Sequence, residues 1–268
     1  MEMILYETAV SFNASCRKYL LLEEAKNNMF IGSLDMAMSI YRDEKYIFGE
    51  VKNQGQTKLL FMCNPKDQMF LYSPTHSMDN GLYEFLAKEL CRAGVQVNSI
   101  KASPVVADWF ASEYSKQTGR ENRINMHMRI LLLTKLKPVR LLPLEVKKIT
   151  FEDDYPLSPE QMQFIREGLV GQEGLYFLIK NNVLVSQAAI RRKASMGGVY
   201  TPEEYRRNGY SSTLVYQLAK RILADGNPYC VIHTDADNFI SNQMYTNMGF
   251  ESIADMKDIT FCTKEACA

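Results

Sequence analysis

Residues 198–250 decide the fold of this chain, and they read GVYTPEEYRRNGYSSTLVYQLAKRILADGNPYCVIHTDADNFISNQMYTNMGF. In order, the stretch holds a short β-rich run at 198–201, a loop, a helix at 210–224, a compact strand at 229–234 and a short helix at 240–248. The long helix is the clearest element, because Leu214, Leu218 and Ile222 recur at helical spacing on one stripe. The pattern predicts a strand that leads through a loop into an amphipathic helix.

The loop at 206–211 has the composition of an anion site. Gly209 lies where the free N–H groups and the positive end of the helix dipole point outward. Glycine and the serines at 211 and 212 let a phosphate approach the backbone closely. Two arginines, Arg206 and Arg207, are suited to phosphate oxygens.

This loop is neither a P-loop nor a dinucleotide fingerprint, since the lysine and hydroxyl of G-x-x-x-x-G-K-[ST] and the spacing of G-x-G-x-x-G are missing. One glycine between a strand and a helix is a weak signal when it is taken alone. The neighbouring motifs make it specific.

The stretch resembles the GNAT superfamily of N-acyltransferases, whose loop follows the pattern Arg/Gln-x-x-Gly-x-Gly/Ala. Arg206 and Gly209 match this pattern, and Ser211 departs from it at the last position. The tail Asn238-x-x-Ser241-x-x-x-Tyr245-x-x-x-Gly249-Phe250 is similar to the superfamily's second signature. The resemblance covers residues 136–268, and the first half follows the order of elements of the divergent N-terminal domain in a two-domain bacterial subgroup.

The resemblance implies an α+β fold with a mixed, mostly antiparallel central sheet flanked by helices, in two tandem domains at 1–135 and 136–268. Residues 1–135 have no loop of the same kind, so only the second domain is expected to bind the coenzyme. The sequence predicts three antiparallel strands at 46–51, 57–62 and 68–72 in the first domain and a proline-containing linker at 135–143. It also predicts helices at 13–26, 77–92, 104–119 and 159–167.

The resemblance also implies direct transfer of an acetyl group from acetyl-CoA, as cosubstrate, to a primary amine of a small molecule. Tyr245 would be the catalytic residue that protonates the departing thiolate. The coenzyme would be bound by residues of the short strand, the loop and the last helix: Val199, Tyr200, Thr201, Arg206, Arg207, Asn208, Gly209, Tyr210, Ser211, Ser212, Asn238, Ser241 and Asn242. A backbone N–H of the short strand would polarise the thioester carbonyl.

The general base stays open among four residues near expected strand ends: Glu173, Glu203, His233 and Asp235. His233 lies in the run VIHTD, whose alternation is equally typical of a buried structural histidine. Tyr245 has a structural alternative too, as a buried aromatic on a helix face. No assignment of the base follows from the sequence.

Composition limits the partners. Lys+Arg and Asp+Glu both number 31, and this balance argues against binding to nucleic acid through a basic face. The six cysteines form no C-x-x-C pair, so we expect buried thiols and no metal site. Neither a signal peptide nor an apolar segment of about 20 residues is found, so we expect a cytoplasmic protein that does not enter a membrane.

Two other functions remain open. The first is a non-catalytic module that binds coenzyme A, as a sensor or as a subunit that regulates a partner. Ser211 and the missing base favour this reading slightly, whereas Tyr245 and Asn238 count against it. The second is a generic α/β domain that binds another phosphorylated ligand.

Overall fold

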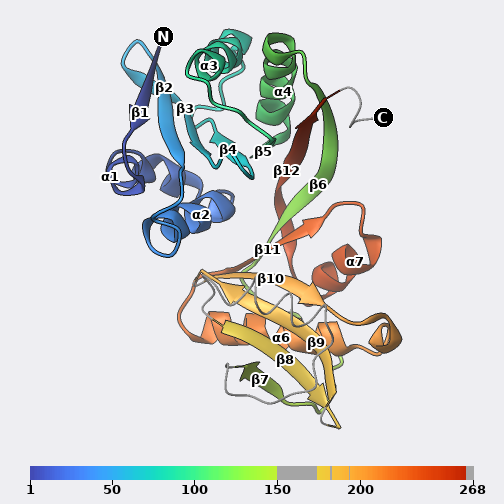
Figure 1. Cartoon of the computed structure of the whole chain (residues 1–268). Helices are drawn as coiled ribbons and strands as arrows, with labels where there is room; N and C mark the ends of the chain where they lie inside the picture. The colour runs from blue at the N-terminus through green and yellow to red at the C-terminus, as the bar shows by residue number, and fades with distance from the viewer. Residues whose placement is uncertain (150–173, 182, 193, 264–268) are drawn as a thin grey trace. The chain divides into compact units, whose positions relative to one another are not determined.

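The computed structural model describes residues 1–149, 174–181, 183–192 and 194–263 (Figure 1). Their contacts separate into two units, one formed by Met1–Arg129 with the described residues from Ala254 onward, the other by Ile130–Ile253. Two long strands, β6 (Glu121–Leu133) and β12 (Glu251–Cys262), belong partly to each unit. Both units are mixed α and β structures with mostly antiparallel pairing, as expected from the sequence.

The other elements of the first unit are β1 (Glu2–Tyr6), α1 (Ala9–Leu20), the 3₁₀ turn η1 (Leu21–Glu23), α2 (Asn28–Met38), β2 (Ile47–Asn53), β3 (Gln56–Cys63), β4 (Met69–Tyr72), α3 (Asn80–Arg92), β5 (Ser99–Ala102) and α4 (Pro104–Thr118). Those of the second unit are β7 (Val146–Ile149), β8 (Gly174–Lys180), β9 (Val183–Arg191), β10 (Ser195–Tyr200), the 3₁₀ turn η2 (Glu203–Tyr205), α6 (Tyr210–Ala224), β11 (Cys230–Asp235) and α7 (Phe239–Met248).

The sheet of the first unit is covered on both faces. Its strand order is β1-β2-β3-β4-β5-β12, and only the β4–β5 pair in this series is parallel. Along β3, Leu60 and Met62 pack in the cluster formed with α1 and α2, whereas Leu59 and Phe61 pack in the cluster formed with α3 and α4. The continuous apolar run of β3 reflects this double burial, since successive side chains of a strand point to opposite faces.

The described sheet of the second unit runs β11-β10-β9-β8-β7, and α6 contacts β8, β9, β10 and β11 (Figure 1). The predicted stripe of α6 is the buried one, because Leu214, Leu218 and Ile222 all lie in the main cluster of this unit. The sheet side of that cluster includes Met196 of β10 and Ile232 of β11. Burial of this stripe holds α6, and with it the loop before α6, against the sheet.

The three predicted strands of the meander are confirmed as β2, β3 and β4. The helices predicted at 77–92, 104–119, 210–224 and 240–248 are confirmed as α3, α4, α6 and α7, with shifts of a few residues at their boundaries. Two elements were missed, β1 and α2, and the helix expected at 13–26 is instead α1 followed by η1. The helix expected at 159–167 lies outside the described residues. The division also differs at the C-terminus from the expected 136–268 domain, because β12 pairs with β5 through Lys257↔Ala102 to Thr260↔Ser99 and adds Ile259 and Phe261 to the core of the first unit.

The cysteines depart in part from the expectation of buried thiols. Cys16, Cys63 and Cys230 are buried and free, Cys91 is free but exposed, and Cys262 is disulfide-bonded. Burial raises the pKa of the Cys63 thiol to about 12 and that of Cys230 to about 12, so both stay protonated. Among the described helices, none is long and apolar enough to cross a membrane.

Two glycines of the first unit give a matched test of this packing. A Cβ at Gly49 of β2 would lie 2.3 Å from Cζ of Phe61 and 2.9 Å from the Ile4 carbonyl oxygen, whereas a Cβ at Gly32 of α2 meets nothing within 4 Å. We expect Gly49→Ala to lower the free energy of unfolding by about 1–3 kcal/mol through overpacking. Gly32→Ala should raise it by about 0.5–1 kcal/mol through helix propensity. Urea unfolding followed by circular dichroism measures both, and equal effects of the two substitutions would contradict the packing described for β2.

Candidate functional site

The N-terminus of α6 presents free backbone donors. Gly209 is its N-cap residue with φ +80°, and no side chain of the described residues caps the first turn. The first intrahelical bond of the turn runs from Thr213 N to the Gly209 carbonyl (3.0 Å), so the N–H groups of residues 210–212 have no helical acceptor. Arg207 also has a positive φ, +63°, in a region that a non-glycine residue rarely adopts. This turn of N–H groups at the positive end of a helix is suited to an anion.

Two of the predicted coenzyme contacts, Arg206 and Asn208, make hydrogen bonds within the loop. Nε of Arg206 donates to the Thr201 carbonyl (3.1 Å). Nδ2 of Asn208 donates to the carbonyls of Tyr205 (3.2 Å) and Arg206 (3.0 Å). Arg207 is exposed and pairs with none of the described residues, so its guanidinium is available to a ligand. The two neighbouring arginines therefore have different roles.

The side chains of the first two residues of α6 are engaged within the protein, so these residues offer a ligand their backbone N–H groups. The Tyr210 ring is 6% exposed, and its hydroxyl accepts a hydrogen bond from Lys180 Nζ (2.8 Å). Ser211 donates to Sδ of Met244 in α7 (3.6 Å), which links the starts of the two helices. The departure at Ser211 from Gly/Ala thus has a structural partner on α7.

Strands β10 and β11 pair over two residues and then separate. The parallel register is Ser195↔Val231 and Met196↔Ile232, although β10 continues to Tyr200 and β11 to Asp235. On its other side β10 shifts register against β9 between Gly197 and Tyr200. The backbone of residues 197–200, with Val199 and Tyr200, is therefore unpaired toward β11 within the described sheet. Such an edge offers N–H and C=O groups to an extended ligand.

The end of this free edge is fixed from the β9 side. Ser186 Oγ lies 3.2 Å from the Tyr200 carbonyl oxygen and 2.9 Å from Thr201 Oγ1. The Thr201 carbonyl in turn accepts from Arg206. The edge of β10 and the loop before α6 are consequently held together by short-range contacts.

The polar residues of the second signature shape the start of α7. Asn238 is its N-cap, and its Oδ1 accepts from Ser241 N (3.0 Å). Nδ2 of Asn242 donates to the carbonyls of Asp235 (2.9 Å) and Ala236 (3.0 Å), which ties α7 to the end of β11. These three residues, predicted as coenzyme contacts, thus have a clear structural role, and Nδ2 of Asn238 is the amide group outside the cap.

Tyr245 is buried in the main cluster of the second unit. Its ring is 4% exposed and lies edge-on to Phe250, with ring centroids 5.7 Å apart. Desolvation by burial raises the pKa of its hydroxyl well above the ordinary value, so it is protonated at every physiological pH. Gly249 ends α7 with φ +102°, and a Cβ there would lie 2.8 Å from the Lys135 carbonyl oxygen. Glycine is therefore required to bring Phe250 back onto the Tyr245 ring.

Two buried polar atoms on the strands next to β10 have no hydrogen-bond partner among the described residues. Gln187 of β9 is 1% exposed, and neither its Oε1 nor Nε2 of His233 in β11 has a hydrogen-bond partner among the described residues. Burial, with a smaller contribution from the positive charge of Arg191, lowers the pKa of His233 to about 4. Arg191 lies over Gly197 of β10, where a Cβ would be 3.4 Å from Nε of Arg191. Because unpaired buried polar groups are rare, each of these atoms is suited to a hydrogen bond with a ligand.

The sequence singled out His233 but missed Gln187 and Arg191. The signal for Gln187 is a polar pair, Ser186-Gln187, inside the apolar run of β9. Of the other base candidates, Glu203 lies in η2 and is exposed, and Glu173 lies outside the described residues. Asp235 accepts from Asp237 N (3.0 Å) in the turn before α7. His233 is therefore the most buried of the candidates that the structure describes.

A pocket of about 310 Å³ lies between α6 and α7. It is lined by Val139, Arg140, Ser212, Ile240, Gln243, Met244, Asn247 and Met248. Apolar side chains and one arginine, beside the free first turn of α6, are suited to the apolar and anionic parts of one ligand. No cluster of three or more His, Cys, Asp or Glu side chains that could hold a metal ion occurs among the described residues.

Comparison with known proteins gives one family and several structures. A family profile described as FR47-like protein matches residues 174–258, which include the separated strands and both helices of the site. No curated protein matches the chain by sequence.

Solved structures share the fold over nearly the whole chain. A Drosophila protein from structural genomics has a TM-score of 0.68 at 10% identity, covering 96% of this chain and 97% of its own. A GNAT-family acetyltransferase from Colwellia psychrerythraea has a TM-score of 0.59 at 13% identity, covering 98% of this chain and 100% of its own. A tandem GNAT protein from the clavulanic acid biosynthesis pathway has a TM-score of 0.55 at 13% identity, covering 97% of this chain and 98% of its own. This chain therefore has the two-domain fold of GNAT proteins, and residues 174–258 match the FR47-like profile.

Proposed function

We propose that the second unit is an N-acetyltransferase that transfers an acetyl group from acetyl-CoA to a primary amine of a small molecule. The observation that carries the proposal is the uncapped first turn of α6 beside the unpaired edge of β10. One feature is suited to a diphosphate and the other to an extended amide-containing arm, and coenzyme A contains both. The fold of GNAT acetyltransferases and the FR47-like match support acyl transfer in general.

The pyrophosphate of the cosubstrate would be bound by the N–H groups of residues 207–212, with the free guanidinium of Arg207 beside them. Arg206 and Asn208 position these donors through their bonds to the loop carbonyls. The adenosine end would enter the pocket between α6 and α7, next to Arg140 and Met244. The residues at this site thus fit the charged and apolar parts of the coenzyme.

The free edge of β10 would bind the pantetheine arm through Val199 and its neighbours. The register shift lies between Gly197 and Tyr200, and a backbone N–H there that is not used by the ladder would polarise the thioester carbonyl. Holding both substrates against this edge makes the transfer an effectively unimolecular step, which supplies much of the rate.

Tyr245 would donate a hydrogen bond and then a proton to the departing thiolate. Its raised pKa makes it a weaker acid than a free phenol, but the same dry surroundings raise the pKa of a thiolate beside it. Donor and acceptor therefore remain matched, and Tyr245 holds its proton until the thiolate forms.

Gln187 and His233 would orient the acceptor amine. Each has a buried polar atom without a partner among the described residues, and His233 is neutral at physiological pH because its pKa is lowered to about 4. Such a histidine is a weak base, so the amine would bind after losing its proton, and His233 would act as a positioning residue.

We also propose a cytoplasmic location.

The alternative function is a non-catalytic module that binds coenzyme A. The weak basicity of His233 favours it, because the described site then holds no strong general base. A domain that binds another phosphorylated ligand is distinguished from both by the coenzyme specificity tested below.

Coenzyme binding is tested by thermal unfolding with acetyl-CoA, coenzyme A and ATP. A ligand at one hundred times its Kd stabilises the folded state by about 2.7 kcal/mol, so both coenzyme forms should raise Tm and ATP should not. Gly209→Ala forces a Cβ onto a left-handed residue of the loop and should abolish the shift. Gly226→Ala is the control, because Gly226 has φ +88° at the other end of α6. A shift with ATP, or an unchanged shift in Gly209→Ala, would count against the coenzyme site.

Replacing Tyr245 with phenylalanine tests its role in the transfer. We expect kcat to fall at least 100-fold while the Kd for acetyl-CoA is unchanged, because the donor is lost and the ring packing is kept. Tyr216→Phe, a partly buried tyrosine in the same cluster, should leave both values unchanged. Stopped-flow kinetics and calorimetry measure them. Unchanged turnover in Tyr245→Phe would remove the donor assignment, and coenzyme binding without turnover in the unmodified protein would favour the non-catalytic module.

The neutral state of His233 gives a pH dependence of stability. Unfolded histidine takes up a proton near pH 6.5, whereas folded His233 does so near pH 4. The contribution of neutral His233 to the free energy of unfolding is therefore complete above pH 6.5 and is lost as pH falls toward 4. Between pH 7 and pH 5 the free energy of unfolding should fall by about 2 kcal/mol. Urea unfolding at both pH values should show this loss in the native chain but not in His233→Gln. His127→Gln, at an exposed position, is the control, and a pH dependence that survives in His233→Gln would contradict the assignment.

A further inference from the structure

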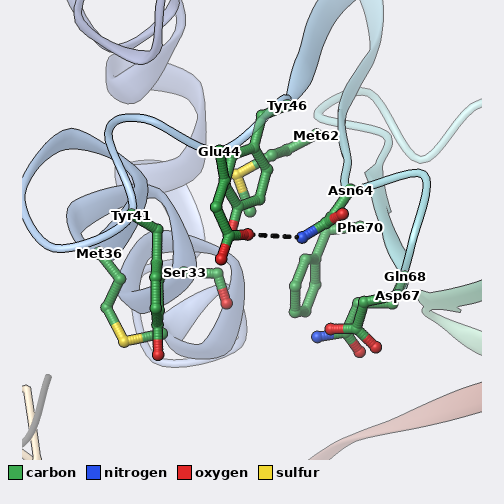
Figure 2. A pocket seen from close by; sticks show the side chains of 10 residues that line it. All are labelled: Ser33, Met36, Tyr41, Glu44, Tyr46, Met62, Asn64, Asp67, Gln68 and Phe70. Atoms are coloured by element: carbon green, nitrogen blue, oxygen red, sulfur yellow. Dashed lines mark hydrogen bonds between the residues drawn. The ribbon is translucent and has the colours of Figure 1, made fainter. Parts of the chain in front are cut away.

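The first unit contains a second pocket that the proposed acetyl transfer does not use. Its volume is about 340 Å³, within the usual range for small-molecule sites. Figure 2 shows its lining, which comes from α2, the segment before β2, the end of β3, the β3–β4 turn and β4. The residues are Ser33, Met36, Tyr41, Glu44, Tyr46, Met62, Asn64, Asp67, Gln68 and Phe70.

The walls of this pocket are aromatic and sulfur-containing. Phe70 and Met62 are each 2% exposed and are direct partners in the β4–β3 register, so they form a fixed apolar floor. Tyr46 stacks on Phe48 at a centroid distance of 5.8 Å, which fixes its ring beside that floor. Aromatic faces attract cations through the ring quadrupole, and methionine adapts to ligands of varied shape.

The charged side chains that line the pocket are all acidic. Its lining includes two carboxylates, Glu44 and Asp67, and no basic side chain. One oxygen of Glu44 accepts from Nδ2 of Asn64 (3.1 Å), the contact drawn in Figure 2, and neither carboxylate has an ion-pair partner in the described part of the chain. Lys101 lies next to the lining, where its Nζ donates to Gln68, and its charge is paired with Asp258 (3.5 Å).

The negative charge of the pocket affects the pKa of the Tyr46 phenol. Burial raises the pKa of this phenol most, a hydrogen bond with Asn64 lowers it, and the negative charges of Glu44 and Asp67 raise it further. The described groups do not suit a metal ion, since no cluster of three or more His, Cys, Asp or Glu side chains is found among them. An organic cation fits both the charge and the walls.

We propose that the pocket formed by Glu44, Asp67, Tyr41, Tyr46 and Phe70 binds an organic ammonium ion with an apolar body. The ammonium group lies near the carboxylates, and the apolar body packs between the rings and Met62. The binding is weak and reversible, because Glu44 and Asp67 are exposed and their attraction is screened by solvent. This site does not depend on acetyl transfer by the second unit.

Calorimetric titration of the full chain without coenzyme tests the proposal. The probes are phenethylamine, which is a cation at pH 7, and 2-phenylethanol, its neutral counterpart of similar shape. We expect the amine to bind and the alcohol to bind at least tenfold more weakly. Raising the salt concentration from 0.05 M to 0.5 M should weaken amine binding further. No binding of the amine, or equal binding of both probes, would overturn the proposal.

Variants locate the binding. Glu44→Gln and Asp67→Asn should each weaken amine binding about threefold, and the double variant about tenfold. The glutamine keeps an acceptor for Asn64, and the Asp67 side chain makes no hydrogen bond with the described residues, so the fold is preserved. Asp43→Asn, an exposed acid beside Glu44 that pairs with Arg42 (4.0 Å), is the control and should bind as the native chain does. Unchanged binding in the double variant would overturn the proposal and place any amine site outside this pocket.

Discussion

The separation of β10 from β11 after two paired residues is the constraint on which the second unit depends. A paired edge would leave no backbone groups for a ligand, and the register shift against β9 sets where the pairing ends. The surrounding contacts hold this geometry: Ser186 fixes the far end of β10, and Arg206 joins that end to the loop before α6. The buried stripe of α6 then holds the loop against the sheet. The site thus results from the incomplete pairing of β10 with β11, and the contacts of Ser186, Arg206 and α6 stabilise this arrangement.

Residues of one motif contribute to this site in different ways. In the loop, Arg206 shapes the backbone and Arg207 is free, although the two are adjacent and identical in type. In the second signature, Asn238 and Asn242 determine where α7 begins, and Gly249 determines where it ends. Tyr245 is the member that the proposed mechanism uses for chemistry. Most residues of this motif thus build the helix on which that tyrosine lies.

Strong local patterns made much of the fold predictable. The stripe of α6 and the β3 run were clear because each periodicity matches its burial, and the loop and second signature located the candidate site. The missed elements have weak signals. Helix α2 contains Gly32, no acidic residue in its first turn and no side-chain cap, so its formation depends on tertiary burial of Phe30, Ile31 and Leu34. Strand β1 is short and only partly buried, and it is held by β2.

The site was less predictable because it depends on contacts between strands. Gln187 is 46 residues before His233, and only the register of β9, β10 and β11 brings their two strands to either side of Gly197. The division into units was unpredictable for the same reason. The sequence contains no sign that β12 pairs with β5, since that ladder joins residues more than 150 positions apart.

The position of β12 affects the order in which the protein can be completed during synthesis. Ile259 and Phe261 fill the core of the first unit, and Arg120 hydrogen-bonds the Phe261 carbonyl. The ribosome makes β12 after the second unit, so the first unit cannot close its hydrophobic core until the second unit has been made. Until then the edge of β5 is unpaired, and other strands can pair with it. Completion of the first core therefore depends on synthesis of the second unit.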